Sequence, residues 1–241
     1  MKFKAIAVSA TAAALSLGLA GSAMAAPAGH TAKSAPQVTG SRLQSALLPA
    51  SAFGSGYTVA DRLNTGGKLW STRVNVKLSS LSCANFETFN VVGGYGNTAG
   101  ATEGINNPSP AIADYPSIFL AGDATVLQFK TASAATSFYN AEYSKYKSCS
   151  DFTEGDVAGN GSVELTNQLL VKTTIGKNAA FQLVQLASIA SFSTFGFYEN
   201  TAVVLSGTNV YTIDDLDGTN DQVTPSLLGS LISRVQALYK R

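Results

Sequence analysis

The stretch VLQFKTASAATSFYNAEYSKYKSC, residues 126–149, joins a strand pattern to a helix pattern and so decides the class of fold. Its start continues a strand-like run, 117–130, in which we expect a hairpin turn around Gly122-Asp123. Residues 131–149 predict a helix capped by Thr131 or Ser133. Its apolar side chains recur at helical spacing, at Ala135, Phe138, Tyr139, Tyr143 and Tyr146. A strand followed at once by such a helix indicates a sheet with a helix packed on it.

The C-terminal half continues this pattern with more strands and one more helix. Residues 162–175, 179–200 and 201–213 are strand-like, and the last run contains a turn at 206–209. A final helix follows Thr224-Pro225, which suit the N-cap and the first helical position. Because strands follow one another without regular βαβ alternation, the sequence predicts an α+β fold: an antiparallel β-sheet with helices packed on it.

The N-terminal half is less regular. A short helix is expected from Ser41 to near Pro49, and a strand over 56–64. Another helix can begin at Ser82. The Gly-, Asn- and Pro-rich segment 93–110 is expected to be a long surface loop, because these residues favour turns.

The first residues have the three parts of an export signal. Lys2 and Lys4 precede an apolar run, and Ala23-Met24-Ala25 matches an A-x-A cleavage site. We therefore expect a signal peptide at 1–25, a flexible leader at 26–40 and one α+β domain at 41–241. The product is expected to be secreted, or associated with the cell surface by something other than lipid or a membrane span.

Composition excludes some partners. The formal net charge of the chain is +1, and charged residues make up 13% of it. Such a chain has no basic surplus for binding nucleic acid. Cys83 and Cys149 are its two cysteines, and in an oxidising compartment they are expected to form one structural disulfide. Free thiols or a redox site are the alternative, but the pair lacks C-x-x-C spacing.

Catalytic motifs are mostly missing from the sequence. His30 is the single histidine and falls in the predicted leader, so no histidine triad is expected. Ser144 and Lys147 fit an S-x-x-K spacing, but two solvated helix positions explain them as well. Segment 93–100, GGYGNTAG, fails the G-x-G-x-x-G spacing of a dinucleotide loop, and no cofactor is expected. Carboxylate pairs remain as candidates for glycosidase chemistry, among Glu87, Glu103, Asp114, Glu164, Glu199 and the Asp214 cluster.

The aspartate-rich stretch YTIDDLDGTND, residues 211–221, superficially resembles a calcium loop. If Gly218 occupies the invariant glycine position of an EF-hand, the first and last ligand positions fall on Ile213 and Thr224. Neither supplies the required carboxylate. No metal site is predicted, although a weak surface cation site stays an alternative. The stretch is better explained as a strand end and a turn at Asp217-Gly218 before the last helix.

The chain resembles the PknH-like extracellular sensor domain family of actinobacteria. The resemblance is carried by distributed segments: LLPASAFGSGYTV (47–59), the cysteine Cys83, VLQFKTASAATSFYNAEYSKYKSC, AVVLSGTNVYTI (202–213) and TPSLLGSLISRVQ (224–236). It implies an antiparallel sheet with helices, a disulfide and a cleft that binds an extracellular ligand. Family members often carry a second disulfide, whereas this chain has one cysteine pair. The resemblance carries over no catalytic residue.

These observations together predict a secreted, non-enzymatic binding or sensor-like domain. Its ligand would be a small molecule or envelope component held in a cleft between sheet and helices, with segment 93–110 as a possible rim. Two alternatives stay open. One is a carboxylate-dependent extracellular glycan hydrolase, which requires two facing acidic side chains. The other is a protein-interaction or inhibitor module, which requires an exposed apolar patch.

Overall fold

The computed structural model describes residues 36–64, 96–106, 122–149, 151–154, 163–189, 196–215 and 225–240. The chain divides into two units, Met1–Lys33 and Ser34–Arg241, and every described residue belongs to the second. The predicted signal peptide and His30 therefore lie outside the described residues, as do the predicted helix at Ser82 and most of the leader.

Eight strands form one antiparallel sheet in the described part of the chain. Their order across the sheet is β1-β2-β3-β8-β7-β6-β5-β4. The strands are β1 (Thr58–Asn64), β2 (Asn97–Asn106), β3 (Gly122–Phe129), β4 (Asp151–Glu154), β5 (Val163–Ile175), β6 (Asn178–Ile189), β7 (Gly196–Ser206) and β8 (Asn209–Asp215). Strands β5, β6, β7 and β8 pair in sequence order, each antiparallel to the next. β8 also pairs with β3 and so joins these strands to β1, β2 and β3.

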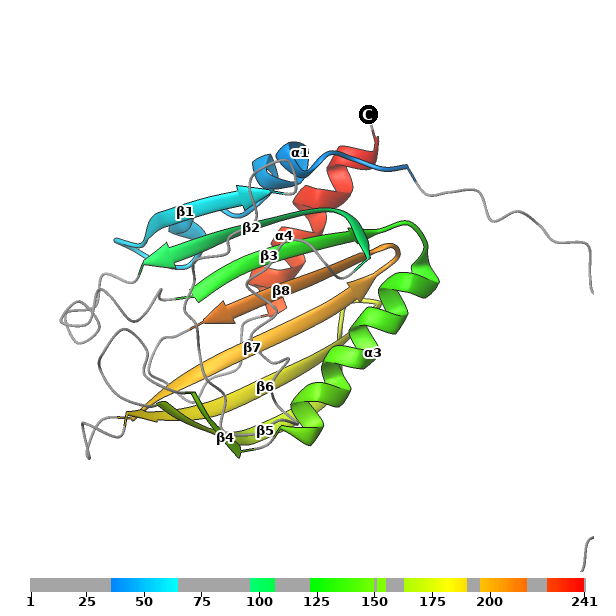
Figure 1. Cartoon of the computed structure of the whole chain (residues 1–241). Helices are drawn as coiled ribbons and strands as arrows, with labels where there is room; N and C mark the ends of the chain where they lie inside the picture. The colour runs from blue at the N-terminus through cyan, green and yellow to red at the C-terminus, as the bar shows by residue number, and fades with distance from the viewer. Residues whose placement is uncertain are drawn as a thin grey trace, which may run out of the picture. The chain divides into compact units, whose positions relative to one another are not determined.

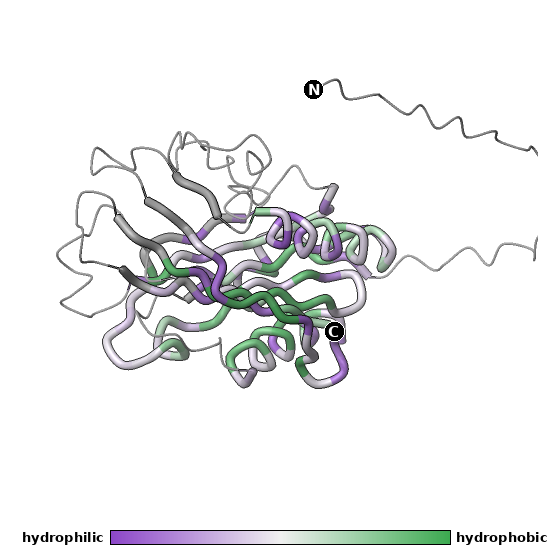
Figure 2. Tube along the Cα trace, turned by 90° about the horizontal axis from the view of Figure 1, so that it is seen from below, coloured by the Kyte–Doolittle hydropathy of each residue, from purple (hydrophilic) through white to green (hydrophobic). Residues whose placement is uncertain are grey.

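Helices lie on both faces of the sheet. Helix α3 (Ala132–Ser148) crosses one face, and α1 (Gly40–Ser45) and α4 (Pro225–Ala237) lie on the other (Figure 1). Short 3-10 turns, η1 (Ala50–Ala52) and η4 (Leu238–Lys240), follow α1 and α4. The view from below shows the sheet between these two helical layers, with hydrophobic positions along the strands (Figure 2). The predicted α+β class, an antiparallel sheet with helices packed on it, is confirmed.

Each face of the sheet has its own hydrophobic core. On the α4 face, strand side chains such as Val126, Tyr211 and Ile213 pack with Leu228 and Leu231 of α4. On the α3 face, residues one position along the same strands pack against α3; they include Leu127, Phe129, Phe181, Leu183, Val203 and Val210. The alternation of side chains along a strand divides the sequence between these two cores.

Helix α3 forms where its sequence predicts it. Thr131 is the N-cap, and its hydroxyl accepts a hydrogen bond from the backbone N–H of Ala134 at 3.1 Å. The predicted apolar stripe faces the sheet around Phe181. The ring centroid of Phe181 lies 5.3 Å from that of Tyr139, 5.5 Å from that of Tyr143 and 5.8 Å from that of Tyr146. Aromatic packing of this geometry fixes the helix on the sheet.

Helix α1 begins earlier and ends earlier than predicted. Its N-cap is Thr39, not Ser41, because the Thr39 hydroxyl accepts the N–H of Arg42. The helix ends at Ser45, so Leu47 and Leu48 follow it as buried residues. Val38, within the expected leader, is 7% exposed and belongs to the α4-face core.

The prediction of a surface loop at 93–110 is wrong for the central part of this segment. Asn97–Asn106 form the ten-residue strand β2, most of which is buried. Gly100 and Gly104 are strand residues, although glycine weakens an isolated strand. Ladders with β1 on one side and β3 on the other outweigh this low propensity, so the predicted rim of a cleft is instead part of the sheet.

Three further strand boundaries differ from the prediction. Gly122-Asp123 do not form a hairpin turn, because they are the first residues of β3 and pair with β2 and β8. The predicted run 179–200 is divided between two strands, because β6 ends at Ile189 and β7 begins at Gly196. β4 has no counterpart in the prediction. The turn predicted at 206–209 is confirmed, with Gly207 in the left-handed region at φ 62°.

The final helix matches its prediction over the described residues. α4 begins at Pro225, and Leu228, Leu231, Ile232 and Val235 are its buried side chains. Thr224, the predicted N-cap, lies outside the described part. None of the helices that the structure describes has the length and hydropathy to span a membrane.

Candidate functional site

The α3 face of the sheet changes from apolar to polar along each central strand. On β8, Val210 lies in the core under α3, and the next residues on the same face are Thr212 and Asp214. On β3 the same face carries Leu127 and then Thr125. Beyond the core under α3, the same face of these strands therefore carries hydrogen-bonding side chains instead of apolar ones.

The strand register brings these polar side chains together. Thr125 is the cross-strand neighbour of Thr102 on β2 and of Thr212 on β8. Asp214 is the neighbour of Asp123 on β3 and of Thr201 on β7. With Gln185 of β6, which follows Phe181 and Leu183 on the same face, they form a group that we call the polar floor. The polar floor consists of Thr102, Asp123, Thr125, Gln185, Thr201, Thr212 and Asp214.

Hydrogen bonds order the part of the polar floor on β2 and β3. The Thr125 hydroxyl oxygen lies 2.7 Å from that of Thr102 and 3.2 Å from Asp123 Oδ1. In both contacts the Thr125 hydroxyl is the donor, and because it has one proton it serves Thr102 or Asp123 at a given moment, with the shorter contact to Thr102. The Thr125 hydroxyl therefore links Thr102 of β2 to the Asp123 carboxylate of β3.

The other side of the polar floor is tied to the end of α3. Gln185 Nε2 donates to Asn167 Oδ1 at 2.8 Å, and Asn167 Nδ2 donates to the carbonyl of Tyr146 at 2.8 Å. Asn167 sits next to a bulge in β5, where the register shifts between Asn167 and Leu169. The bulge and these bonds fix where the last turn of α3 meets the sheet.

Burial distinguishes the two carboxylates from the rest of the polar floor. Its threonines and Gln185 are buried, whereas Asp123 and Asp214 keep intermediate exposure. Asp123 and Asp214 stand directly opposite each other on β3 and β8. Like charges in this position repel, so the pair favours groups that bring positive charge or hydrogen-bond donors. The two neighbouring carboxylates are therefore the groups of the polar floor that keep contact with solvent.

Glu142 is a buried carboxyl on α3. It lies among the sheet-facing residues and is 3% exposed, although the sequence pattern predicts apolar residues on this face. Lys145 Nζ donates to Glu142 Oε1 at 2.6 Å. Burial raises the pKa of the Glu142 carboxyl, and the Lys145 ammonium opposes the shift.

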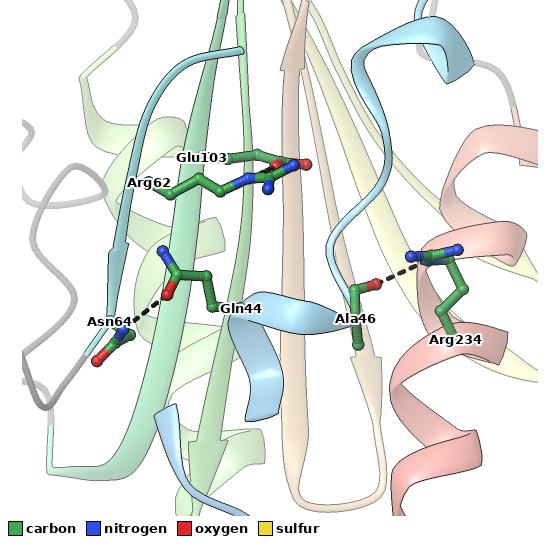
Figure 3. Close-up of polar contacts among 6 residues, drawn as sticks. All are labelled: Gln44, Ala46, Arg62, Asn64, Glu103 and Arg234. Atoms are coloured by element: carbon green, nitrogen blue, oxygen red, sulfur yellow. Dashed lines mark hydrogen bonds and ion pairs between the residues drawn. The ribbon is translucent and has the colours of Figure 1, made fainter. Parts of the chain in front are cut away.

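The candidate carboxylates from the sequence are not gathered in one site in the described part of the chain. Asp214 belongs to the polar floor. Glu103 lies on the opposite face, where it is fully buried and paired with Arg62 (Figure 3). The remaining candidates lie outside the description: Glu87 and Asp114 entirely, and Glu164 and Glu199 as regards their side chains.

The aspartate-rich stretch is only partly a turn. Asp214 and Asp215 are the last residues of β8 and pair with β3 and β7. Asp217, Gly218 and Asp221 lie outside the described residues. Where side chains are described, no group of three or more histidine, cysteine or acidic residues could hold a metal ion.

The S-x-x-K pair occupies ordinary helix positions. Ser144 and Lys147 are exposed on α3, and the Ser144 hydroxyl donates to the carbonyl of Asn140 at 2.9 Å. A serine bonded to its own helix backbone lacks an activating base. The interpretation as solvated helix residues fits this geometry.

Cys149 lies where α3 ends. It is the C-cap residue, its N–H donates to the carbonyl of Lys145 at 2.8 Å, and its side chain is 2% exposed. Cys83 lies outside the described residues. The pairing of Cys83 with Cys149 therefore stays a prediction.

The interaction-module alternative requires an exposed apolar patch. Among the described residues, the exposed large hydrophobic side chains are Leu169 at 38% and Val171 at 37%, two positions apart on β5. Two partly exposed side chains do not make a patch of several hundred Å². This part of the surface does not favour that alternative.

Sequence reasoning missed most of the polar floor. Asp123 was assigned to a turn and Thr102 to a loop, and in the structure both lie within strands. The usable signal is the alternation in DATVLQF (123–129), in which Asp123 and Thr125 precede Leu127 and Phe129 on one face. Which polar ends become neighbours depends on register across five strands, and the sequence does not show that directly.

Comparison with known proteins supports the fold. No family model matches the sequence, and no curated protein sequence matches it either. The structure is similar to the crystal structure of the extracellular domain of PknH from Mycobacterium tuberculosis, with a TM-score of 0.59 and 16% sequence identity. The two chains share a fold. The similarity covers 85% of this chain and 98% of the PknH domain, which confirms the architecture that the sequence resemblance implied.

Proposed function

We propose that this chain is a non-enzymatic, extracellular binding domain and that the polar floor is its ligand site. The observation that carries the proposal is the change from apolar to polar side chains on the α3 face. The sequence pattern of an export signal and the fold shared with an extracellular domain support the location.

The polar floor costs stability that a fold alone does not require. Transferring hydroxyl and amide groups from water into an interior is unfavourable unless hydrogen bonds replace water, and even then the gain is small. The opposite face of the same strands carries Ala124, Val126, Tyr211 and Ile213, which are all fully buried. These positions alternate with the polar floor along β3 and β8, so these parts of the strands can be stabilised with apolar residues, and we take the polar groups as a ligand site.

Asp123 and Asp214 define the kind of ligand. Both carboxylates are partly exposed and lie on adjacent strands, so a bound molecule can bridge them. The ligand class that fits is a small polar molecule with several hydrogen-bond donors, such as a polyol, an amine or an amino sugar.

A binding screen tests this proposal. Melting temperatures would be measured for the purified domain with a panel of polyols, amines and amino sugars. Thr125→Val removes the hydroxyl that bonds Asp123 and should abolish most of the ligand-induced shift. Thr173→Val, at an exposed position of β5, is the matched control and should keep it. Ligand shifts that are the same in both variants would contradict the assignment of the site.

One observation favours a second candidate, the carboxylate-dependent glycan hydrolase. Asp123 and Asp214 are cross-strand neighbours on one face of the sheet, and such chemistry needs a pair of nearby carboxyl groups. Hydrolysis of a glycan panel by the wild-type domain, lost in both Asp123→Asn and Asp214→Asn, would favour the enzyme over the binding domain. Binding without turnover would favour the binding domain.

We also propose that Cys83 and Cys149 form a disulfide. They are the two cysteines of the chain, and Cys149 is buried where α3 ends. In the chain-entropy model, closing so long a loop stabilises the fold by about 4 kcal/mol. Mass spectrometry of the non-reduced exported protein should find a mass two hydrogen atoms below that of the reduced chain, and two alkylatable thiols would refute the bond.

A further inference from the structure

Glu103 is a carboxylate in apolar surroundings. It is fully buried in β2, on the α4 face of the sheet. Its neighbours along the strand on this face are Ala101 and Ile105, and its cross-strand neighbour on β3 is Ala124, all fully buried. Burying a carboxylate among such groups costs free energy unless ion pairs and hydrogen bonds compensate.

In the described part of the chain, the hydrogen-bonded partner that compensates for this burial comes from the edge of the sheet. Arg62 Nε donates to Glu103 Oε2 at 2.9 Å, and the Arg62 side chain is 46% exposed (Figure 3). Among the described residues, Glu103 Oε1 has no hydrogen-bond partner. Arg62 belongs to β1, which pairs with β2 on one side and is the outermost strand at this edge among the residues that the structure describes.

The charged groups that act on Glu103 come from two elements. Arg62 of β1 bonds it directly, and Arg234 of α4 attracts it without a direct bond. Arg234 uses its Nε to bond the carbonyl of Ala46 at 2.9 Å. Burial outweighs both guanidinium groups, so the pKa of the Glu103 carboxyl is raised above its ordinary value of 4.5.

We propose that Glu103 is a proton-dependent latch for the edge strand β1. When Glu103 is neutral, docking of β1 over it carries no charge-burial cost, and the strand is held tightly. When Glu103 is ionised, burial of the charge outweighs the hydrogen bond from half-exposed Arg62 and the more distant attraction of Arg234, and docking is weaker. Opening of β1 admits water to Glu103 and relieves the cost.

The direction of the pH effect follows from linkage. The docked form retains the Glu103 proton to a higher pH than the open form, in which the carboxyl is hydrated. Opening of β1 therefore becomes easier as pH rises from 4.5 through the raised pKa of the docked form, and is insensitive to pH below this window. Acidification tightens the edge of the sheet.

The effect would extend to the N-terminal helix. Asn64, the last residue of β1, donates through Nδ2 to Gln44 Oε1 of α1 at 2.7 Å (Figure 3). Release of β1 breaks this contact between strand and helix. The inference is independent of the proposed ligand site, because Glu103 points to the opposite face from the polar floor.

Hydrogen–deuterium exchange of the β1 amides tests the latch. Exchange rates at 58–64 would be measured in wild type and in Glu103→Gln from below pH 4.5 to neutral pH. Dividing the wild-type rate by the variant rate at each pH cancels the intrinsic exchange rate. The ratio should rise with pH, by up to about tenfold per unit within the window, and be constant below it. A ratio that does not change with pH would overturn the proposal.

Two further variants and one direct titration complete the test. Arg62→Gln should speed β1 exchange above the window and leave it unchanged below. Glu142→Gln, a second buried glutamate but on α3, should keep the wild-type pH profile of β1. If Glu103→Gln does not fold, the Glu103 carboxyl of wild type can be titrated by carbon NMR. A Glu103 pKa at or below 4.5 would overturn the latch. A higher pKa together with pH-dependent exchange of β1 would support it.

Discussion

At the residue scale, Gln128 shows how one buried polar side chain can join distant segments. It is 1% exposed on the α4 face of β3. Its Nε2 donates to Gln37 Oε1 at 2.8 Å and to the carbonyl of Val38 at 3.1 Å. Its Oε1 accepts the Val38 N–H at 3.0 Å and the Tyr239 hydroxyl at 2.7 Å. One amide therefore holds both the segment before α1 and the η4 turn after α4 on the sheet.

Gln128→Ala should lower the free energy of unfolding by about 2 to 4 kcal/mol, because the buried backbone groups of Val38 lose their hydrogen bonds together with Gln37 and Tyr239. Urea unfolding monitored by circular dichroism measures this. Gln168→Ala is the matched control, since Gln168 is exposed on β5, and its effect should stay within about 0.5 kcal/mol. Equal effects of the two variants would show that the Gln128 bonds do not stabilise the fold.

Glu142 leads to a pH prediction at the same scale. Its pKa is raised in the folded state, so its contribution to stability is fully present below the ordinary value of 4.5 and is lost as pH rises through the folded value. Relative to Glu142→Gln, wild type should lose up to about 1.4 kcal/mol per pH unit within that window. Urea unfolding of both proteins at a series of pH values measures the difference, and a difference independent of pH would contradict the prediction.

At the element scale, the N-cap of α3 can be tested in isolation. Thr131→Ala removes the hydroxyl that accepts the Ala134 N–H, and should cost about 1 kcal/mol of stability. Thr136→Ala, also on α3, removes a hydroxyl that bonds the carbonyl of Ala132 within the helix. This control should be neutral or slightly stabilising, because alanine has the higher helix propensity. Thermal unfolding of both variants compares them, and a larger loss in the control would refute the assignment of Thr131.

Elements with strong local signals could be predicted from the sequence, and β2 could not. The structure confirms three predictions that rest on local features: the cap at Thr131, the aromatic spacing of α3 and the helix start at Pro225. β2 has glycine, asparagine and alanine where strands usually have branched residues, and its burial comes from pairing on both sides. Strand formation that depends on pairing partners distant in the sequence cannot be predicted from local propensity.

The polar floor was hidden for the same reason. Asp214 was noticed in the sequence as part of an aspartate cluster, but its structural partner is Asp123 on another strand, distant along the chain. The assignment depends on strand order β3-β8-β7 and on a register that a shift by one residue would invert. Local patterns predicted the layers of the fold, and long-range pairing decided which polar groups meet.

At the scale of the whole molecule, one sheet serves two cores. Val203 and Val210 pack under α3, whereas Val204 and Tyr211, their next residues, pack under α4. Loss of either helical layer therefore exposes one face of the same strands. The described unit should unfold in one cooperative step, because neither layer can stay packed without the shared sheet.

Leu231→Ala tests this coupling. Leu231 is fully buried in α4, so the substitution should cost about 2 to 5 kcal/mol. Leu227→Ala, at a half-buried position of the same helix, should cost about 1 kcal/mol. Far-ultraviolet circular dichroism would report the backbone, and near-ultraviolet dichroism would report the tyrosines that pack on Phe181 across the sheet. Both signals should shift to the same lower midpoint in Leu231→Ala. If the aromatic signal kept its wild-type midpoint, the two faces would be unfolding separately, and the shared strands would not couple them.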